Sequence, residues 1–333
     1  MVVQIIEKCK NYTAALIRGF VDATQIRRFL AAWRISMIKL GNTVLLVQDL
    51  CKKFKGFEID NVSFTLDAGY IMGFIGRNGA GKTTILKLIQ NVLVKNSGTV
   101  RVCGYDNIKE EIKAKNEIGF VADECPFVKT YTLLENAELF GKYYNDFDMA
   151  KFESYLNRFC LNGKQNILSL SKGMVSRFQL AFALSHNPRL LIMDEPNDGL
   201  DPIFRREFIS LLQELIAEEK MGILFSTHIT SDLDKIADYI TLVNKGEIVL
   251  SEDKETLLEA HTIIKGKQEL LLGLSPKKLI GTRKYPGGFE AMAAELGEED
   301  LQYIASGKGM LQRPTLEDVM YYYSKGRIQN GKA

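Results

Sequence analysis

A loop of nine residues carries the most specific chemical pattern in this sequence. It reads G-R-N-G-A-G-K-T-T and lies between an apolar run at residues 71–75 and a helical pattern at residues 85–89. A strand, a glycine-rich loop and a helix in this order are the context that a phosphate-binding loop of the form G-x-x-x-x-G-K-[ST] requires. Glycines let successive N–H groups point inward, and the start of the helix adds partial positive charge. We therefore expect nucleotide phosphates to bind at Gly76, Arg77, Asn78, Gly79, Ala80, Gly81, Lys82, Thr83 and Thr84.

Four side chains in two patterns could carry the chemistry of phosphate transfer. Lys82 can reach the β- and γ-phosphates, and the hydroxyl of Thr83 can ligate Mg²⁺. A second apolar run, at residues 190–193, ends in Asp194 and Glu195 and resembles a Walker B strand. We expect Asp194 in the shell of Mg²⁺ and Glu195 as the carboxylate that polarises a water in line with the γ-phosphate. The alternative is a buried strand whose two acids only cap the next helix.

A third motif narrows the family. Residues 170–174 read L-S-K-G-M and resemble the LSGGQ signature of ATP-binding-cassette (ABC) proteins. In that family the serine hydroxyl and the glycine N–H bind the γ-phosphate held by the opposite subunit, so that two cassettes sandwich two ATP molecules. Ser171 and Gly173 keep these groups, whereas Lys172 and Met174 depart from the pattern. Without the resemblance, Ser171 is simply a helix N-cap.

The same resemblance assigns roles to three further positions. Residues 197–201 are similar to the D-loop that couples the two ATP sites, which places Asp201 at the nucleotide. His228 resembles the switch histidine that contacts the γ-phosphate and steadies the catalytic carboxylate. Phe54 stands where the family stacks an aromatic ring on adenine, with Phe57 as the competing candidate. A core aromatic is the alternative for Phe54.

Asp123 occupies the position where the family usually has the glutamine of the Q-loop. The resemblance implies contact with Mg²⁺, and a carboxylate can ligate this ion directly or through a bridging water. An acidic residue here, with a short C-terminal extension, is similar to cassettes paired with ABC-2-type membrane proteins. The alternative is an acidic residue on a solvated loop.

The patterns around these motifs predict an α/β fold. Strand-like runs lie at residues 44–47, 62–66, 70–75, 99–102, 118–121, 190–193 and 223–226, followed by a hairpin at 240–250. Buried strands that alternate with helices indicate a parallel sheet covered on both faces, with ligands at the carboxyl ends of its strands. The resemblance implies a P-loop NTPase (RecA-like) core with an antiparallel β subdomain and a helical signature subdomain, plus a small C-terminal α+β extension.

The expected organisation has three parts. Residues 44–250 form the ABC nucleotide-binding domain, with its helical subdomain at about residues 124–185, and residues 251–333 form a small accessory domain. Residues 1–40 are a basic extension with helical spacing that holds seven Lys or Arg and two acids. Three interpretations stay open for it: a helix on an anionic membrane surface, a helix packed on protein, or an over-extended start with Met37 as the initiator.

Composition narrows the class of protein. The chain is 46% hydrophobic and 25% charged with a net charge of +2, which suits a globular protein. It holds no uninterrupted apolar run of about 18 residues, the length needed to cross a bilayer. Its five cysteines form no C-x-x-C pair, which favours a reduced, cytosolic protein without structural zinc.

The resemblance implies an ATPase that powers transport, with export as the expected direction, through a separate integral-membrane subunit. ATP and Mg²⁺ are the expected cofactors, and the partner cassette is a second copy or a related chain. The expected place is the cytoplasmic face of the cell membrane, and no nucleic acid is expected. The alternatives are a soluble ABC ATPase acting on ribosomes or nucleic acid, and a regulatory module. Ribosome-acting members typically carry two cassettes, whereas this chain has one phosphate loop.

Overall fold

The computed structural model describes residues 42–217 and 221–329. The chain divides into two compact units, Met1–Thr43 and Val44–Ala333, and nearly all of the described residues belong to the second. The three interpretations of residues 1–40, including the start at Met37, lie outside the described residues.

An antiparallel sheet opens the second unit. Its strand order is β2-β1-β4-β5, and the strands are β1 (Thr43–Phe54), β2 (Phe57–Asp67), β4 (Ser97–Val102) and β5 (Tyr105–Asp106). β2 largely alternates exposed and buried side chains because one face of the sheet packs on the core. Both β1 and β2 extend beyond the apolar runs that predicted them. In β1, Cys51 still pairs with Ser97 although the flanking residues are polar.

A second, mainly parallel sheet has six strands. Its order is β10-β9-β3-β8-β7-β6, and only β10 is antiparallel to its neighbour. The strands are β3 (Ile71–Ile75), β6 (Ile118–Val121), β7 (Leu190–Asp194), β8 (Gly222–Thr227), β9 (Tyr239–Asn244) and β10 (Glu247–Asp253). Every residue of β3, β7 and β8 is buried, as expected for strands covered on both faces. The predicted strands and hairpin are confirmed.

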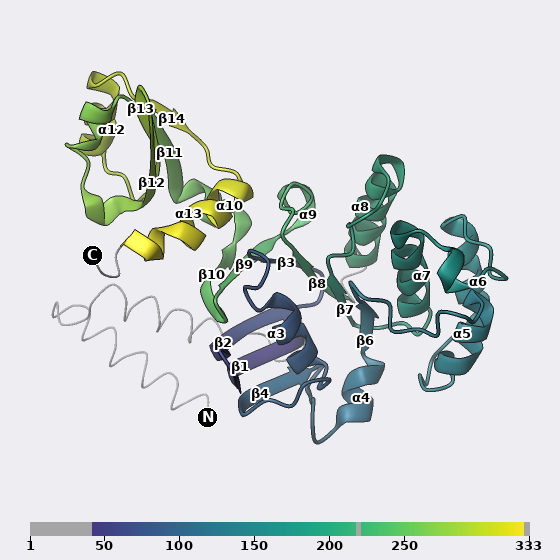
Figure 1. Ribbon diagram of the computed structural model, residues 1–333. Coiled ribbons are helices and arrows are strands. Elements are labelled where there is room, and N and C mark those ends of the chain that lie inside the picture. The colour runs from purple at the N-terminus through teal and green to yellow at the C-terminus, as the bar shows by residue number, and fades with distance from the viewer. Residues whose placement is uncertain (1–41, 218–220, 330–333) are drawn as a thin grey trace. The chain divides into compact units, whose positions relative to one another are not determined.

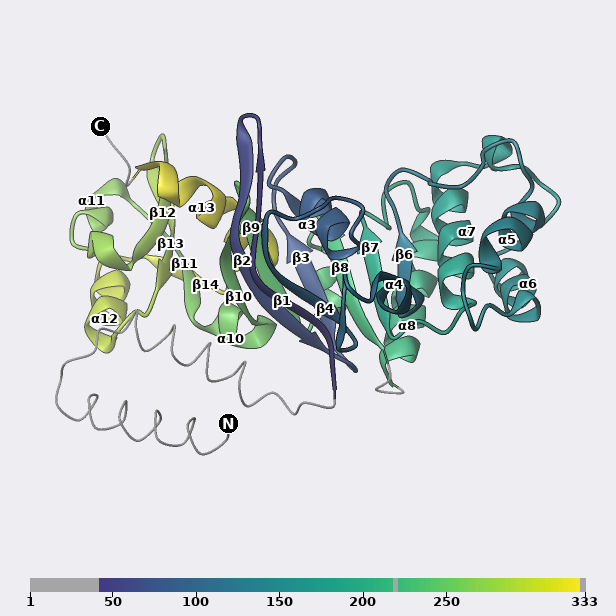
Figure 2. The same cartoon turned by 90° about the horizontal axis from the view of Figure 1, so that it is seen from below.

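The register of this sheet brings the functional residues to one edge. Ile75 at the end of β3 is opposite Thr227 of β8, and Asp194 of β7 is opposite Ser226. The carboxyl ends of β3, β7 and β8 therefore meet at the same edge. The helices next to these strands are α3 (Lys82–Ile89) between β3 and β4, α4 (Glu111–Asn116) between β5 and β6, α8 (Pro202–Ala217) between β7 and β8, and α9 (Leu233–Ile236) between β8 and β9. Apolar side chains of α3 share one core with both sheets, beside which the helix lies in Figure 2.

Beyond the β6 edge of the parallel sheet, Figure 1 shows a group of helices. They are α5 (Leu133–Gly141), α6 (Met149–Arg158), the 3₁₀ turn η1 (Ile167–Ser169) and α7 (Lys172–Leu184). Aromatic rings pack edge to face in this group: the centroid of Phe127 lies 4.8 Å from that of Phe178 and 4.9 Å from that of Phe182. This packing anchors the incoming loop before α5 on α7, the helix that carries the signature motif.

The C-terminal part of the chain has α+β character. Its antiparallel sheet has the order β12-β13-β11-β14. Its elements are α10 (Lys254–Glu259), β11 (His261–Gly266), α11 (Gln268–Leu271), η2 (Pro276–Lys278), β12 (Leu279–Tyr285), β13 (Gly288–Ala294), α12 (Glu298–Ser306), β14 (Met310–Gln312) and α13 (Leu316–Gln329). Buried His261 ties this part together, since its Nε2 lies 2.7 Å from the hydroxyl of Tyr323 on α13. Within the described ranges, no helix has the length and apolarity needed to span a membrane.

Candidate active site

The predicted phosphate loop connects β3 to α3 and has the backbone that its glycines predict. Gly79 and Gly81 adopt φ angles of 78° and 109°, a region that side chains rarely tolerate. Gly76 lies so close to β9 that an added Cβ would stand 2.4 Å from the carbonyl oxygen of Val243. The geometry therefore favours glycine at both fixed glycine positions, Gly76 and Gly81, and also at Gly79. The loop delivers a helix N-terminus to the carboxyl edge of the sheet, where backbone N–H groups can bind phosphate.

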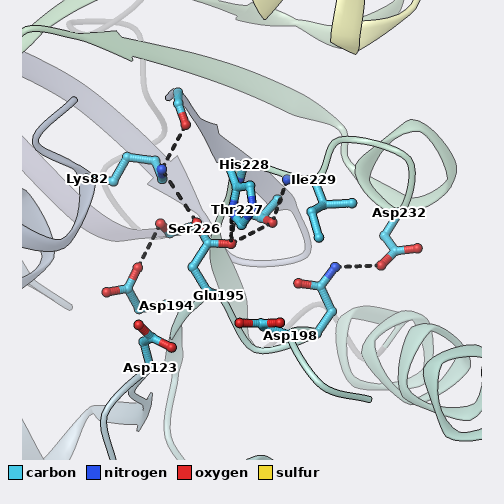
Figure 3. A network of polar contacts seen from close by, with 12 residues as sticks. Lys82, Asp123, Asp194, Glu195, Asp198, Ser226, Thr227, His228, Ile229 and Asp232 are labelled. Carbon is cyan, nitrogen blue, oxygen red and sulfur yellow. Dashed lines mark hydrogen bonds and ion pairs between the residues drawn. The ribbon is translucent and has the colours of Figure 1, made fainter. Parts of the chain in front are cut away.

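Lys82 is buried although it is charged, with 6% of its side chain exposed. Its ammonium group donates a hydrogen bond to the carbonyl of Gly76 at 2.8 Å and lies 3.5 Å from Oε1 of Glu195 (Figure 3). A buried cation needs such partners because desolvation is costly. Lys82 thus points across the loop toward the catalytic candidate, in the space where phosphate oxygens would lie.

Asp194 is the last residue of β7 and is almost fully buried. The hydroxyl of Ser226 on β8 donates to its Oδ1 at 3.0 Å. Burial raises the pKa of the Asp194 carboxyl, and hydrogen bonds from the hydroxyls of Thr83 and Ser226 partly oppose this rise. A carboxylate and a hydroxyl that already touch are the hard oxygen donors that Mg²⁺ prefers. The donor set of Thr83 and Asp194 therefore fits this ion.

Glu195 is held in place by several partners. Its carboxylate oxygen Oε2 accepts hydrogen bonds from the hydroxyl of Thr227 at 2.9 Å and from the N–H of His228 at 3.2 Å. The imidazole Nδ1 of His228 lies 2.9 Å from the same oxygen (Figure 3). The backbone of Glu195 has a φ of 49°, which is unusual for a residue other than glycine. This conformation is fixed by the hydrogen bond from the Glu195 N–H to the carbonyl of Ser226. A strained, immobilised carboxylate is typical of a functional position.

The residues that resemble the signature motif lie at the start of α7 and pack against the loop at residues 197–201. Ser171 is the N-cap of α7, and its hydroxyl accepts a hydrogen bond from the N–H of Met174 at 3.3 Å. Gly173 packs so tightly that an added Cβ would lie 2.5 Å from the carbonyl oxygen of Gly199. The glycine is therefore required by close packing within this chain, whatever it binds.

Asp201 has partners of its own within the chain. Its Oδ1 accepts hydrogen bonds from the N–H groups of Ile203 and Phe204 at 3.1 and 2.9 Å and so caps α8. Its other oxygen pairs with Arg177 of α7, whose guanidinium lies 3.7 Å from the ring centroid of Phe204. The hydrogen bond from the N–H of Phe204 lowers the pKa of this carboxyl most. The structure thus gives Asp201 a capping role, while its predicted nucleotide contact remains a prediction.

Asp123 follows β6 and is ion-paired. The ammonium group of Lys172 lies 2.8 Å from its Oδ1 and 2.7 Å from Oδ2 of Asp198. Val121 at the end of β6 is opposite Met193 of β7, so Asp123 and Asp194 both lie at the carboxyl edge of the same sheet.

Both adenine-stacking candidates lie where β1 turns into β2. Phe54 is 40% exposed, and its ring is stacked on that of Phe57 with centroids 6.3 Å apart. Phe57 faces the phosphate loop, because an added Cβ on Gly81 would stand 3.0 Å from its ring. Phe54 has the more open face for a base, and Phe57 supports it.

Three groups important to the site were missed from the sequence. Gln179 is buried, and its amide both accepts from the N–H and donates to the carbonyl of Ala122, which fixes the backbone before Asp123. Ser226 holds Asp194, as described above. Asp232 accepts from Asn197 and from Arg205 at 2.7 Å each, which anchors the loop after β7. Only the polar residues Ser226 and Thr227 at the end of an apolar run gave a signal in the sequence.

The chain is similar to known ATP-binding proteins. The family model described as ABC transporter matches residues 59–198. The chain is 33% identical over 231 residues to the ABC transporter ATP-binding protein NatA of Bacillus subtilis (strain 168), which covers 68% of this chain and 93% of that protein. It is 30% identical over 211 residues to the bacitracin transport ATP-binding protein BcrA of Bacillus licheniformis, covering 62% of this chain and 69% of that protein.

Two solved structures share the fold. One is the ATP-binding subunit of an ABC transporter, with a TM-score of 0.61 and 26% identity, which covers 71% of this chain and 97% of that one. The other is the ATP-binding cassette MJ0796 in a dimeric post-hydrolysis state bound to ADP and Pi. It has a TM-score of 0.57 and 22% identity and covers 63% of this chain and 98% of that one. The second likeness concerns the fold alone.

Proposed function

Because this chain belongs to the ABC transporter family as an ATP-binding protein, we propose that it hydrolyses MgATP with Glu195 as the general base. The observation that carries this proposal is the fixation of one carboxylate oxygen by Thr227 and His228. These donors leave the other oxygen, Oε1, on the side of Lys82. A general base must be held within hydrogen-bond reach of the proton it accepts.

The residues of the phosphate loop bind and orient the substrate. The N–H groups of residues 76–84 and the ammonium of Lys82 hold the β- and γ-phosphates, and Phe54 stacks on adenine. Thr83 and Asp194, with Asp123 as a further ligand, would hold Mg²⁺, which would neutralise charge on the phosphate oxygens. Lys82 exchanges its contacts with Gly76 and Glu195 for phosphate oxygens, which releases Glu195 to act on water.

In the chemical step, a water attacks the γ-phosphorus in line with the leaving ADP. Glu195 accepts a proton from this water as the bond from phosphorus to the bridging oxygen of ADP breaks, and ADP and phosphate are the products. His228 steadies Glu195 from one side and contacts the γ-phosphate from the other.

A complete site requires a second cassette in this proposal. Ser171 and Gly173 lie at a helix start beside the loop that contains Asp201, and we propose that they bind the γ-phosphate held by the partner. The dimer pairs this chain with itself or with a related cassette. Hydrolysis powers transport, in the direction of export, through a separate membrane subunit at the cytoplasmic face of the membrane. The relatives support this role, because they are named as ATP-binding proteins of transporters.

The test is Glu195→Gln, which keeps the shape of the side chain and removes its basicity. We expect nucleotide binding to persist while turnover falls roughly 10²–10⁴-fold, the usual contribution of a positioned base. Glu207→Gln on α8, an exposed acid close in sequence, is the control and should keep the wild-type rate. Wild-type turnover by Glu195→Gln in a phosphate-release assay would show that the base is assigned wrongly.

A further inference from the structure

Lys172 joins three segments that are far apart in the sequence. It is the first residue of α7, and its ammonium contacts Asp123 after β6 and Asp198 after β7, at 2.8 and 2.7 Å. The three side chains are about half exposed, between 45% and 49%. We call Asp123, Lys172 and Asp198 the ionic cluster. Lys172, the central residue of this cluster, replaces the first glycine of the signature motif.

Other contacts press the same helix onto the same loop. Gly173 meets the carbonyl of Gly199, and Arg177 pairs with Asp201 and covers the ring of Phe204. These contacts place the start of α7 on the loop at residues 197–201. Lys172 also reaches Asp123, two residues after the end of β6, so the cluster extends the contact to the edge where Asp194 lies.

Lys172 and Asp198 both favour their charged forms. Hydrogen bonds to Asp123 and then to Asp198 raise the pKa of the Lys172 ammonium. The hydrogen bond from Lys172 lowers the pKa of Asp198 most, and the charge of Lys172 lowers it further. Since the N–H of Asp198 also donates to the carbonyl of Glu195, the cluster is joined to the backbone of the candidate base.

We propose that Lys172 is a positioning residue whose ammonium group holds Asp198 and Asp123 in place, and thereby couples the signature segment to this chain's own nucleotide site. The second half rests on the proposed function. Ser171 and Gly173, the groups offered to a partner's γ-phosphate, are the two neighbours of Lys172. A ligand docked on them shifts the start of α7, and the ionic cluster transmits that shift to Asp123 and to the loop that follows Glu195.

The first experiment tests whether the ionic cluster holds the loop after β7, and it requires neither ATP nor a dimer. Hydrogen exchange is followed in the full chain without nucleotide at the amides of Asp198 and Leu200, which are bonded to the carbonyls of Glu195 and Asn197. Exposed ion pairs contribute little to global stability, so local opening is the sensitive readout. In Lys172→Met these amides should exchange roughly 3- to 10-fold faster, whereas Lys172→Arg, which keeps the charge, should match wild type.

The control is Lys164→Met, at an exposed lysine that makes no ion pair with the described residues, and it should leave exchange unchanged. Asp198→Asn should have little further effect in the Lys172→Met background, because the pair is already broken. The positioning role of the ionic cluster would be overturned if Lys172→Met exchanged at the wild-type rate, or if Lys172→Arg showed an equal increase in exchange rate. Full additivity of the two substitutions would overturn the pairing with Asp198.

The second experiment tests the coupling through ATP hydrolysis. Lys172→Met should lower kcat roughly 5- to 20-fold and raise the Mg²⁺ concentration needed for half-maximal rate, with KM for ATP changed less than about twofold. Lys172→Arg should recover most of the rate. Unchanged kcat and Mg²⁺ dependence in Lys172→Met would overturn the coupling. If the wild type itself fails to hydrolyse MgATP, the proposed function fails. The exchange experiment still decides whether the ionic cluster holds the loop after β7.

Discussion

Burial of the Asp194 carboxylate opposes the stability of the folded protein, whereas the proposed hydrolysis needs an oxygen from this residue. Its carboxylate is almost fully buried, and burial raises its pKa. The native state therefore holds a proton on this group more tightly than the unfolded chain does. The stability from this group is present at low pH and is lost as pH rises through the raised pKa. At neutral pH the ionised carboxylate destabilises the protein when no cation is bound.

Asp194→Asn should therefore stabilise the protein while it removes a proposed Mg²⁺ ligand. An amide keeps the hydrogen bond from Ser226 and carries no charge to bury. Without nucleotide and in a chelator, we expect a gain of about 1 kcal/mol, or roughly 2–4 °C in Tm for a domain of this size. Calorimetry at pH 7 measures it. The difference from wild type should shrink as pH is lowered, and a lower Tm for the variant at pH 7 would contradict the argument.

Asp123 offers a test of the metal assignment. Asp123→Ala removes an oxygen ligand, so hydrolysis should fall at limiting Mg²⁺ and recover in part as Mg²⁺ rises. Asp123→Asn keeps a carbonyl oxygen and should be milder. Affinity for ADP without metal should hardly change in either variant, which serves as the control. Superimposable Mg²⁺ titrations of the rate for wild type and Asp123→Ala would remove Asp123 from the metal site.

At the scale of elements, α7 organises much of the site. It begins at the N-cap Ser171, its middle clamps the backbone of Ala122 through Gln179, and its apolar rings pack against Phe127. Just beyond its end, buried His186 is stacked on Tyr144 with ring centroids 4.1 Å apart. Burial lowers the pKa of His186 to about 4. The helix is therefore anchored at both ends, and one anchor depends on pH.

His186 should make the helical region sensitive to acid. The unfolded chain binds the proton near pH 6.5 and the native state only near pH 4, so stability from this group is present above the unfolded pKa and falls as pH drops toward 4. We expect a loss of about 2 kcal/mol between pH 7 and pH 5 from this residue. His186→Phe keeps a ring on Tyr144 and should flatten this dependence. Denaturant unfolding of both proteins at the two pH values measures this loss. An equal loss of unfolding free energy in wild type and His186→Phe would contradict the role given to His186.

At the scale of the whole molecule, the proposed function requires a second cassette that contributes its signature motif to the site. Ser171→Arg places bulk and charge where the partner's γ-phosphate would dock and leaves this chain's own phosphate loop intact. We expect the monomer to bind nucleotide while ATP-driven dimerisation fails. Ser154→Arg, on the exposed face of α6, should dimerise as wild type does. Light scattering after size exclusion decides, and normal dimers of Ser171→Arg would count against the sandwich.

Much of this fold could be predicted from the sequence because its strands are short and fully buried. The runs that end in Ile75, Asp194 and Thr227 needed no context to be recognised. Strand ends were predicted less well at β1, where pairing with β4 carries polar residues into the sheet. Alternation and apolar runs report burial, and they do not report the ladder partners that extend a strand.

By itself, the sequence determined the chemical groups: a glycine loop with a lysine, two carboxylates after an apolar strand, and a serine and glycine at a helix start. These are local patterns, because each depends on neighbours within a few residues. Only the tertiary structure decided which groups meet. It placed Lys82 against Glu195, Asp201 on the end of α8, and Lys172 between Asp123 and Asp198. Such contacts join segments that lie far apart in the chain, and their geometry follows from sheet register and helix packing.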